Sequence, residues 1–258
     1  MVVSKNVPVQ PEPLAQLQHR LASTRLVIFD FDGVVADSEV LSLRTLRDTL
    51  HAHGVALSLQ QVREKFLGAS LATITEFAAR HHSTGFASDA FATDWQATLF
   101  AAFRAGLQPA TGLVALLDRL QAHRLPFCIA SSSTHERIRV ALATMQLSDR
   151  FPHIFSAQDV ALGKPAPDLF LHAAKCMKIA PADCLVIEDS PLGIAGATAA
   201  GMDSVGFVGG SHLQGITADH ADRLQNAGAG WILQGHDTVI NLLSGAPAGS
   251  TLTLWTDQ

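Results

Sequence analysis

Two aspartates, Asp30 and Asp32, flank a single phenylalanine and are followed at once by Gly33. The glycine lets the backbone turn sharply and present its amides. Two carboxylates this close repel each other in an apolar setting unless a cation neutralises them or one of them holds a proton. Mg²⁺, which prefers oxygen ligands, is the expected partner. Taken alone, the short motif is more typical of a solvated turn.

A serine cluster at positions 131–133 has the chemistry to hold an anion. Ser131 and Ser132 follow an apolar run, and hydroxyls beside backbone amides at the start of a helix attract phosphate groups. Ser133 and Glu136 have the spacing of a capping box for that helix. Capping alone would explain Ser133, but it explains Ser131 less well because Ser131 lies at the end of the expected strand.

Lys164 lies between Gly163 and Pro165, on a constrained loop that precedes an expected helix beginning near Pro167. An ammonium group fixed in this way acts as a compact point charge, which could neutralise a phosphoryl group and the carboxylates together. A solvated surface lysine is the competing interpretation.

A second acidic pair, Glu188 and Asp189, repeats the design of the first. It follows an apolar run and precedes Ser190 and Pro191, which suit the cap and the first position of a helix. If this strand neighbours the first, four carboxylates converge, and that density of charge requires a divalent cation.

The elements that must position these groups are short apolar strands alternating with helices. This rhythm predicts an α/β fold, a doubly wound parallel sheet with a Rossmann-like core. Thr111 is the expected cap of the helix that precedes the second strand. Ligands bind at the carboxyl ends of such strands. We expect strands at residues 26–29, 127–130, 154–156, 185–187 and 204–207, with weaker elements near residues 231 and 239–243.

Between the first two strands the apolar spacing becomes helical, and nothing in this segment resembles a strand. We expect a helical cap at residues 37–106, inserted into a core formed by residues 25–36 and 107–258. Residues 1–24 are a separate N-terminal extension: Val-Pro-Val and Pro-Glu-Pro indicate a loose tail, followed by a short helix at residues 14–21.

The composition favours a soluble globular protein and excludes some partners. Of 258 residues 48% are hydrophobic and 16% charged, with a formal net charge of -5, so nucleic acid is not an expected partner. The three cysteines lack a CxxC spacing and are expected to be reduced packing residues. No apolar run is long enough to span a membrane and no signal peptide is evident, so we expect a cytoplasmic protein, a monomer or weak homodimer.

Four motifs, DFDGVVADSE, ASSS, GKPAPDLF and VIEDSPLGIAGATAAGM, occur in this order. Together they resemble the motifs of the haloacid dehalogenase-like hydrolases. The resemblance extends from Leu26 to about Phe207 and is greatest to the branch that contains β-phosphoglucomutases and sugar-phosphate phosphatases.

This resemblance implies that Asp30 attacks phosphorus to form an aspartyl-phosphate. Asp32 would protonate the leaving oxygen and then activate water. The phosphoryl oxygens would be bound by Ser131 and Lys164, with Ser132 and the amide of Gly33 alongside. The resemblance also implies a Mg²⁺ ion held by Asp30, the backbone carbonyl of Asp32 and Asp189, with Glu188 either a ligand or a neighbour of the ligands.

The implied reaction is hydrolysis of a small phosphorylated metabolite, a sugar or sugar-acid phosphate. A mutase of the β-phosphoglucomutase type is the alternative, but its cap histidine and the arginine that clamps a second phosphate are replaced here by Ser42 and Leu71, so hydrolysis is favoured. Dehalogenases lack the second aspartate, and the context of Lys65 does not suit a phosphonatase. A non-catalytic phospho-receiver is a further alternative, although it needs neither Asp32 nor a cap.

Specificity is expected to come from the cap loop at residues 66–71, with Lys65, Arg63 and Arg44 as candidates to recognise hydroxyls or a distal carboxylate. His212 follows the last strong strand and could reach the mouth of the site, but a surface loop is the favoured interpretation. The other histidines lack metal-ligand spacing and are expected to be solvated.

Overall fold

In the part of the chain that the structure describes, six parallel strands form one sheet in the order β3-β2-β1-β4-β5-β6, which confirms the predicted fold class. The structure, a computed structural model, describes residues 11–67, 69, 71–82 and 86–245. The strands are β1 (Leu26–Phe29), β2 (Phe127–Ser131), β3 (Ile154–Ser156), β4 (Cys184–Glu188), β5 (Asp203–Phe207) and β6 (Trp231–Leu233).

The central strand β1 is buried on both faces, which explains its uninterrupted apolar sequence. Val27 and Phe29 belong to the apolar cluster on one face of the sheet, whereas Leu26 and Ile28 belong to the cluster on the other. Strand β1 pairs with β2 on one side and with β4 on the other. The residues that follow these three strands therefore meet at one edge.

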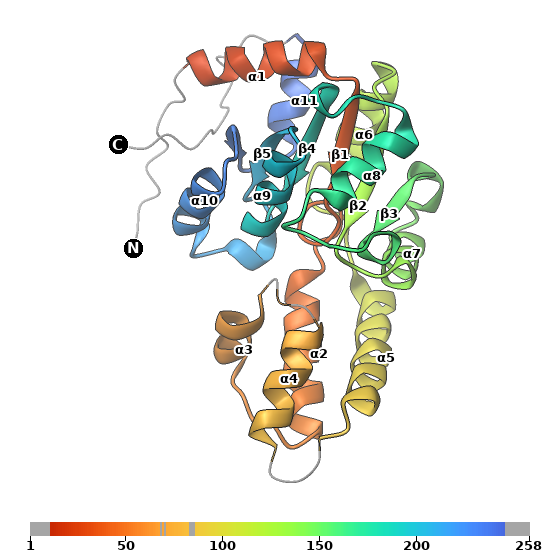
Figure 1. The fold of residues 1–258 in the computed structure, drawn as a ribbon, viewed down its shortest axis with the longest axis vertical. Helices are drawn as coiled ribbons and strands as arrows, with labels where there is room; N and C mark the ends of the chain where they lie inside the picture. The colour runs from red at the N-terminus through yellow and green to blue at the C-terminus, as the bar shows by residue number, and fades with distance from the viewer. Residues whose placement is uncertain (1–10, 68, 70, 83–85, 246–258) are drawn as a thin grey trace.

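Helices cover both faces of the sheet (Figure 1). Apolar residues of α1, α6, α7 and α11 pack on one face, those of α8 and α9 on the other, and α10 contacts β5 and β6. The bounds in the core are α1 (Pro11–Ser23), α6 (Leu113–Ala122), α7 (His135–Thr144), α8 (Asp168–Met177), α9 (Pro191–Ala199), α10 (Thr217–Asn226) and α11 (Asp237–Leu243), with 3-10 turns η1 (Ser148–Arg150), η2 (Ala157–Asp159), η3 (Pro181–Asp183) and η4 (Ser211–Leu213). Among the described residues, no helix is both long enough and apolar enough to cross a membrane.

The N-terminal helix α1 corrects the expectation of a loose tail at Pro-Glu-Pro. The helix begins at Pro11, because prolines are tolerated in a first turn whose amides have no partner within the helix. Leu14, Leu17 and Leu21 are buried in the main apolar cluster, so this helix is part of the core packing. The Val-Pro-Val segment lies outside the described residues.

Four helices follow β1 and extend from one edge of the sheet (Figure 1). They are α2 (Glu39–Ala52), α3 (Leu59–Phe66), α4 (Leu71–His81) and α5 (Ser88–Gly106). They share an apolar cluster of their own, which includes Leu46, Phe66 and Phe91. The last part of α5 instead packs with the sheet through Phe100 and Phe103. Helix α5 thus spans the junction between the four-helix group and the sheet.

Two further expectations concern caps and cysteines. Gly112, not Thr111, is the N-cap of α6; its φ of +80° is unfavourable for a residue with a side chain, and a turn with this geometry displaces the helix start by one residue. Cys128 and Cys184 are free and buried in one apolar cluster, as expected, whereas Cys176 is free and exposed.

Candidate active site at the sheet edge

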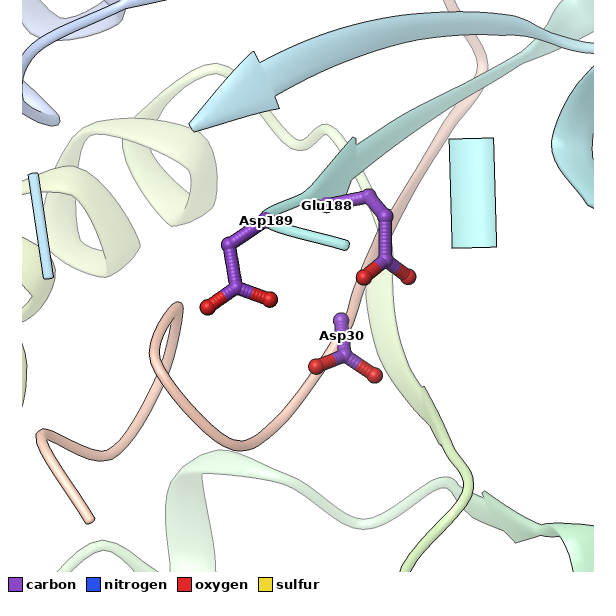
Figure 2. A group of neighbouring side chains, drawn as sticks. All are labelled: Asp30, Glu188 and Asp189. Carbon is purple, nitrogen blue, oxygen red and sulfur yellow. The ribbon is translucent and has the colours of Figure 1, made fainter. Parts of the chain in front are cut away.

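The predicted acidic residues meet at the carboxyl ends of β1 and β4. Asp30 follows β1 directly, Glu188 is the last residue of β4, and Asp189 comes next. One carboxylate oxygen from each of the three lies within 4.8 Å of the others, and all three residues are buried (Figure 2). The pairing of β1 with β4 brings them together, since parallel neighbours end at the same edge.

Burial and mutual repulsion dominate the electrostatics of this cluster. Loss of water around Asp30, together with the charge of Glu188, raises the pKa of Asp30 to about 7. Burial, Asp30 and Glu188 also raise the pKa of Asp189 well above its ordinary value. Three buried carboxylates that converge on one point are a set of hard oxygen donors that a divalent cation such as Mg²⁺ would fit.

Lys164 contributes the one positive charge in contact with these acids among the described residues. Its Nζ donates to Oδ1 of Asp30 at 2.5 Å and to Oε2 of Glu188 at 2.7 Å, and its side chain is only 4% exposed. Burial alone would lower the pKa of Lys164, but the two carboxylates outweigh it and raise the pKa. The predicted lysine is therefore a buried, charged member of the cluster.

Glu188 is held from two sides. While Oε2 accepts from Lys164, Oε1 accepts from the backbone amide of Ser190 at 2.9 Å and from its hydroxyl at 2.8 Å. Ser190 also caps α9, whose first residue is Pro191, as the sequence predicted. These donors fix the orientation of the Glu188 carboxylate toward the lysine.

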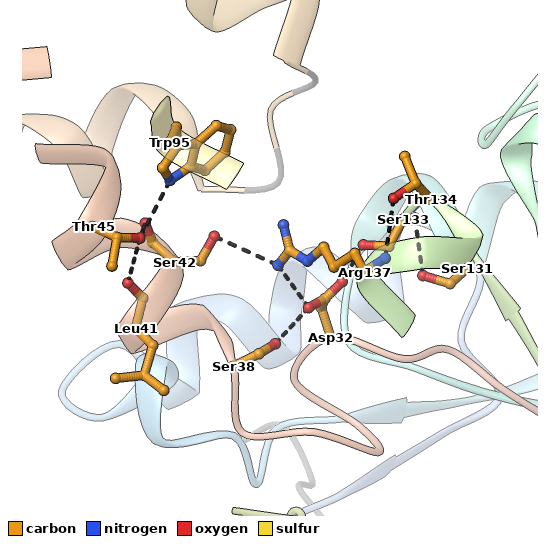
Figure 3. Close-up of polar contacts among 10 residues, drawn as sticks. All are labelled: Asp32, Ser38, Leu41, Ser42, Thr45, Trp95, Ser131, Ser133, Thr134 and Arg137. Atoms are coloured by element: carbon orange, nitrogen blue, oxygen red, sulfur yellow. Dashed lines mark hydrogen bonds and ion pairs between the residues drawn. The ribbon is translucent and has the colours of Figure 1, made fainter. Parts of the chain in front are cut away.

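Asp32 contacts the segment that precedes α2 and the start of α7 (Figure 3). Its Oδ1 accepts from the hydroxyl of Ser38 at 2.5 Å and from Nη2 of Arg137 at 2.7 Å, and its Oδ2 accepts from the hydroxyl of Ser133 at 2.5 Å. Burial alone would raise the pKa of Asp32, but Arg137 and the two hydroxyls outweigh it and lower the pKa. Asp32 is thus held as a carboxylate.

The contact with Ser133 overturns the predicted capping box. Thr134 caps α7 by accepting from the amide of Arg137 at 3.2 Å, and Glu136 accepts from Gln96 of α5 rather than from the start of its own helix. Because the helix begins one residue later than the capping box requires, the hydroxyl of Ser133 is left to donate to Asp32.

Ser131 and Ser132 line the cleft above the acids. Ser131 is buried and its hydroxyl accepts from the amide of Ser133 at 3.1 Å, whereas Ser132 is exposed. Gly33 has a φ of +83°, and a Cβ there would overlap the carboxylate of Asp189. Its amide donates to the carbonyl of Ala36 at 2.7 Å, so the glycine allows close approach to Asp189, and its role toward a substrate stays a prediction.

His212 corrects the favoured interpretation of a surface loop. Its side chain is 3% exposed, with Nε2 3.4 Å from Oδ2 of Asp189, because η4 folds back over Gly33 and Gly210. Burial and the nearby His220 lower the pKa of His212 to about 4, so the imidazole is neutral at physiological pH.

Two other histidines are also buried, which contradicts the expectation that they are solvated. Nε2 of His220 donates to the carbonyl of Asp189 at 2.6 Å, and Nε2 of His236 donates to the carbonyl of Val34 at 3.0 Å. Both imidazoles donate to backbone carbonyls near the sheet edge. The pattern of strands and helices in the sequence does not reveal these contacts.

The segment around η4 also connects the sheet edge to the helical group. The amide and hydroxyl of Ser211 donate to Oδ1 of Asp37, at 3.2 and 2.7 Å, just before α2 begins. Nη2 of Arg63, on α3, donates to the carbonyl of His212 at 2.6 Å.

A cleft of about 1530 Å³ lies between the sheet edge and α2, α3, α4 and α5. Of the three cations expected to recognise substrate, Arg63 lines this cleft. Arg44 and Lys65 are exposed outside it, and Nζ of Lys65 lies over the ring of Phe77. Ser42 and Leu71 both line the cleft, and Leu71 is 43% exposed. Residues 68 and 70 of the predicted specificity loop lie outside the described residues.

Three residues of the site were missed from the sequence: Ser38, Glu39 and Arg137. Glu39 lines the cleft, and burial together with the charge of Asp32 raises its pKa to about 7. Arg137 left a detectable signal, because it lies in the first turn of α7, where the helix dipole disfavours a cation. A residue that opposes local helix stability is a candidate for another role.

The strand order, the helical insertion after β1 and the buried carboxylates at the strand edge define an α/β fold with a candidate site at the carboxyl end of its sheet. The 6-phosphogluconate phosphatase of Escherichia coli (strain K12) is 28% identical over 191 residues, covering 74% of this chain and 85% of that protein. The "Probable pseudouridine-5'-phosphatase" of Drosophila melanogaster is 33% identical over 185 residues, covering 69% and 79% respectively.

A solved structure shares the same architecture. A HAD family hydrolase from Deinococcus radiodurans R1, with bound phosphate and sodium, is 30% identical with a TM-score of 0.70, over 89% of this chain and 99% of that one. The profile of the family described as "Haloacid dehalogenase-like hydrolase" matches residues 27–207. The chain belongs to this family, which confirms the resemblance carried by its four motifs.

Proposed function

We propose that this protein is a Mg²⁺-dependent phosphatase that hydrolyses a small phosphorylated metabolite through an aspartyl-phosphate on Asp30. At the level of enzyme class it is a phosphoric monoester hydrolase, in line with its family and its named phosphatase relatives. The observation that carries the proposal is the contact of Lys164 with Asp30 and Glu188, beside Asp189, at the base of a large cleft.

Asp30 is the proposed nucleophile. Lys164 binds its Oδ1, which orients the carboxylate. Asp30, Asp189 and the backbone carbonyl of Asp32 would hold the metal, and Glu188 stands within reach of the same point. When bound, Mg²⁺ supplies positive charge that offsets the repulsion among the acids and the incoming phosphate. Lys164 and Ser131 would bind the transferred phosphoryl oxygens.

Asp32 is the proposed general acid and base. In the first step the bond between phosphorus and the ester oxygen breaks, a bond from Asp30 to phosphorus forms, and Asp32 gives its proton to the leaving oxygen. In the second step water attacks phosphorus, its proton passes to Asp32, and the aspartyl bond breaks. Arg137 and two hydroxyls stabilise the ionised form of Asp32, which suits the second step. A bound phosphate dianion favours the protonated form needed for the first.

The substrate class we propose is a sugar or sugar-acid phosphate. The cleft has ample volume beyond that needed for the phosphate itself, and Arg63, which lines it, is a candidate ligand for hydroxyls or a distal carboxylate. The name of the Escherichia coli relative agrees with this class. Residues 37–106 would form the cap, since α2, α3, α4 and α5 share an apolar cluster apart from the sheet, with residues 25–36 and 107–258 as the catalytic core.

Hydrolysis is favoured over a mutase reaction. A mutase must bind both ends of a bisphosphate, whereas Leu71, exposed in the cleft, offers no donor for a distal phosphate. A phospho-receiver is disfavoured because it needs neither Asp32 nor a cleft of this size.

The test is a screen of metabolite phosphates for released phosphate, with Mg²⁺ or with EDTA, comparing the wild type with Asp30→Asn. We expect Mg²⁺-dependent release that the substitution abolishes while the fold survives. Asp149→Asn, which removes an exposed carboxylate, is the matched control and should retain activity. Release that persists in Asp30→Asn would overturn the proposal, and stable accumulation of phosphorylated Asp30 without turnover would favour the receiver.

A further inference from the structure

Arg137 occupies a position that packing and helix stability do not explain. It lies in the first turn of α7, where a cation opposes the helix dipole, and its side chain is 17% exposed. The guanidinium lies 5.8 Å from the ring centroid of Phe103 and reaches toward Ser42 of α2 (Figure 3). It thus stands where α7, the end of α5 and the start of α2 meet at the cleft.

Most of its hydrogen-bonding capacity is unused. Nη2 donates to Asp32 at 2.7 Å and lies 3.5 Å from the hydroxyl of Ser42. Nε is buried with no hydrogen-bond partner. The hydrogen bonds that Arg137 donates to described side chains all come from Nη2, so Nη1 has no such partner among them and is not one of the buried orphan atoms. Because Arg137 lines the cleft and Nη1 is not buried, an oxygen of a bound molecule can accept a hydrogen bond from Nη1.

The contact between Arg137 and Asp32 indicates which part of a bound substrate would lie next to Arg137. If Asp32 protonates the ester oxygen, as proposed above, a guanidinium bound to the same carboxylate lies beside the leaving group and not beside the phosphoryl oxygens. In a sugar or polyol phosphate, the next polar atom along the leaving group is an oxygen on the adjacent carbon.

The local charge indicates the kind of oxygen. The positive charge of Arg137 is already matched by Asp32, whose Oδ1 lies 2.7 Å from Nη2, and the carboxyl group of Glu39 lines the same cleft. An additional carboxylate from the substrate would meet two acidic groups and little unmatched positive charge. A neutral acceptor, a hydroxyl or a carbonyl, satisfies the free donors without that repulsion.

We propose that Arg137 is a specificity-determining residue that donates a hydrogen bond to a neutral oxygen on the carbon next to the phosphoester carbon. This deepens the proposed function and rests on it. The preferred substrates are then phosphorylated sugars and polyols with such an oxygen, over alkyl phosphates that lack it and over esters with a carboxylate at that place.

The experiment compares esters that differ by this one group: 2-hydroxyethyl phosphate, ethyl phosphate and phosphoglycolate. It measures kcat/KM for phosphate release by the wild type, by Arg137→Met, and by Arg139→Met, an exposed arginine on the same helix. We expect the wild type and Arg139→Met to prefer the hydroxyethyl ester over the ethyl ester by about 10- to 100-fold, the range for hydrogen bonds to charged groups. Arg137→Met should reduce this preference to about threefold or less.

A role limited to orienting Asp32 predicts another pattern, in which Arg137→Met slows all three esters equally and leaves the preference intact. That result would overturn the proposal, as would a wild type that does not distinguish the hydroxyethyl and ethyl esters, or an Arg137-dependent preference for phosphoglycolate. A wild type that releases phosphate from none of these esters or of the metabolites screened above would refute the proposed function itself, and the role of Arg137 with it.

A binding measurement covers the case of a variant too slow to assay. Calorimetry of the hydroxyethyl and ethyl esters, with Asp30→Asn and with Asp30→Asn/Arg137→Met, separates recognition from turnover. The same preference, present in the first protein and lost in the second, supports the proposal. Equal affinities in the first protein contradict it. Circular dichroism establishes that each variant is folded.

Discussion

In the metal-free protein, Asp30→Asn should gain stability relative to the wild type as the pH rises. Asp30 lies in contact with Lys164 and next to Glu188 and Asp189, and its pKa is raised to about 7 from 3.8 by burial and by the charge of Glu188. The native protein therefore retains a proton on Asp30 that the unfolded chain has lost. Between these pKa values the native state binds more protons, so rising pH destabilises it. Asparagine carries no such proton.

The magnitude follows from the width of this interval. Each pH unit over which one extra proton is retained costs about 1.4 kcal/mol. From about pH 5 to pH 7.5, some two units of that interval are crossed, so the stability gap between the variant and the wild type should widen by about 2 to 3 kcal/mol. Asp30 is also one of the causes that raise the pKa of Asp189, so the substitution lowers the pKa of Asp189. This second effect widens the stability gap in the same direction.

The comparison between two proteins is essential because other groups titrate in the same range. Burial lowers the pKa values of His212 and His236 to about 4, so their unfolded forms bind more protons and their contribution makes stability rise with pH. Glu39, with its pKa raised to about 7, acts in the opposite sense. These contributions occur in both proteins and largely cancel in the gap.

Equilibrium unfolding in urea, followed by circular dichroism in EDTA at several pH values, measures the gap. Asp149→Asn controls for the loss of one exposed carboxylate. Excess Mg²⁺ should narrow or reverse the gap, because the ion stabilises the native wild type through Asp30. A gap that stays constant from about pH 5 to pH 7.5 in EDTA would show that Asp30 is not a crowded, buried carboxylate and would refute this account of the site.

Three further predictions test other parts of the structure. Lys164→Met removes the cation between Asp30 and Glu188, and should lower kcat by about 100-fold or more and metal-free stability by about 3 to 5 kcal/mol near neutral pH, measured by phosphate release and urea unfolding; normal turnover would contradict the role of the lysine. Gly33→Ala places a methyl group against Asp189 and should weaken Mg²⁺ binding about 10-fold or more in calorimetry, whereas unchanged affinity would exclude Asp189 as a ligand. Leu17→Ala should cost about 2 to 5 kcal/mol in urea unfolding, because Leu17 is fully buried where α1 packs on the core; a negligible loss would mean that α1 is not part of the cooperative unit.

The convergence of the acidic residues was predictable because it follows from backbone topology. Asp30 and Glu188 each stand at the end of an apolar run, and parallel strands that are neighbours must end at one edge. Lys164 was predictable for a related reason, since its loop is short and constrained on both sides. In these cases the sequence pattern itself specifies the position of the side chain.

The partners of Asp32 and the burial of His212 depend instead on how separate elements pack. Arg137 reaches Asp32 only because α7 starts at His135 and faces the beginning of α2, a rotation that no local pattern encodes. His212 is buried because η4 folds back over a turn far away in the sequence. In the same way, the sequence predicted a short helix at residues 14–21, but it did not reveal that Leu14, Leu17 and Leu21 are buried in the main apolar cluster.

The segment around η4 has a consequence for how the cleft can open. It is bound to Asp37, at the pivot where the chain leaves the sheet, and to Arg63, much farther along the helical insertion. A swing of the insertion about that pivot would preserve the Ser211 bridge and break the arginine contact. Each time a new substrate enters, the contact between Arg63 and His212 would then have to form again, whereas the residues at the sheet edge would keep their positions.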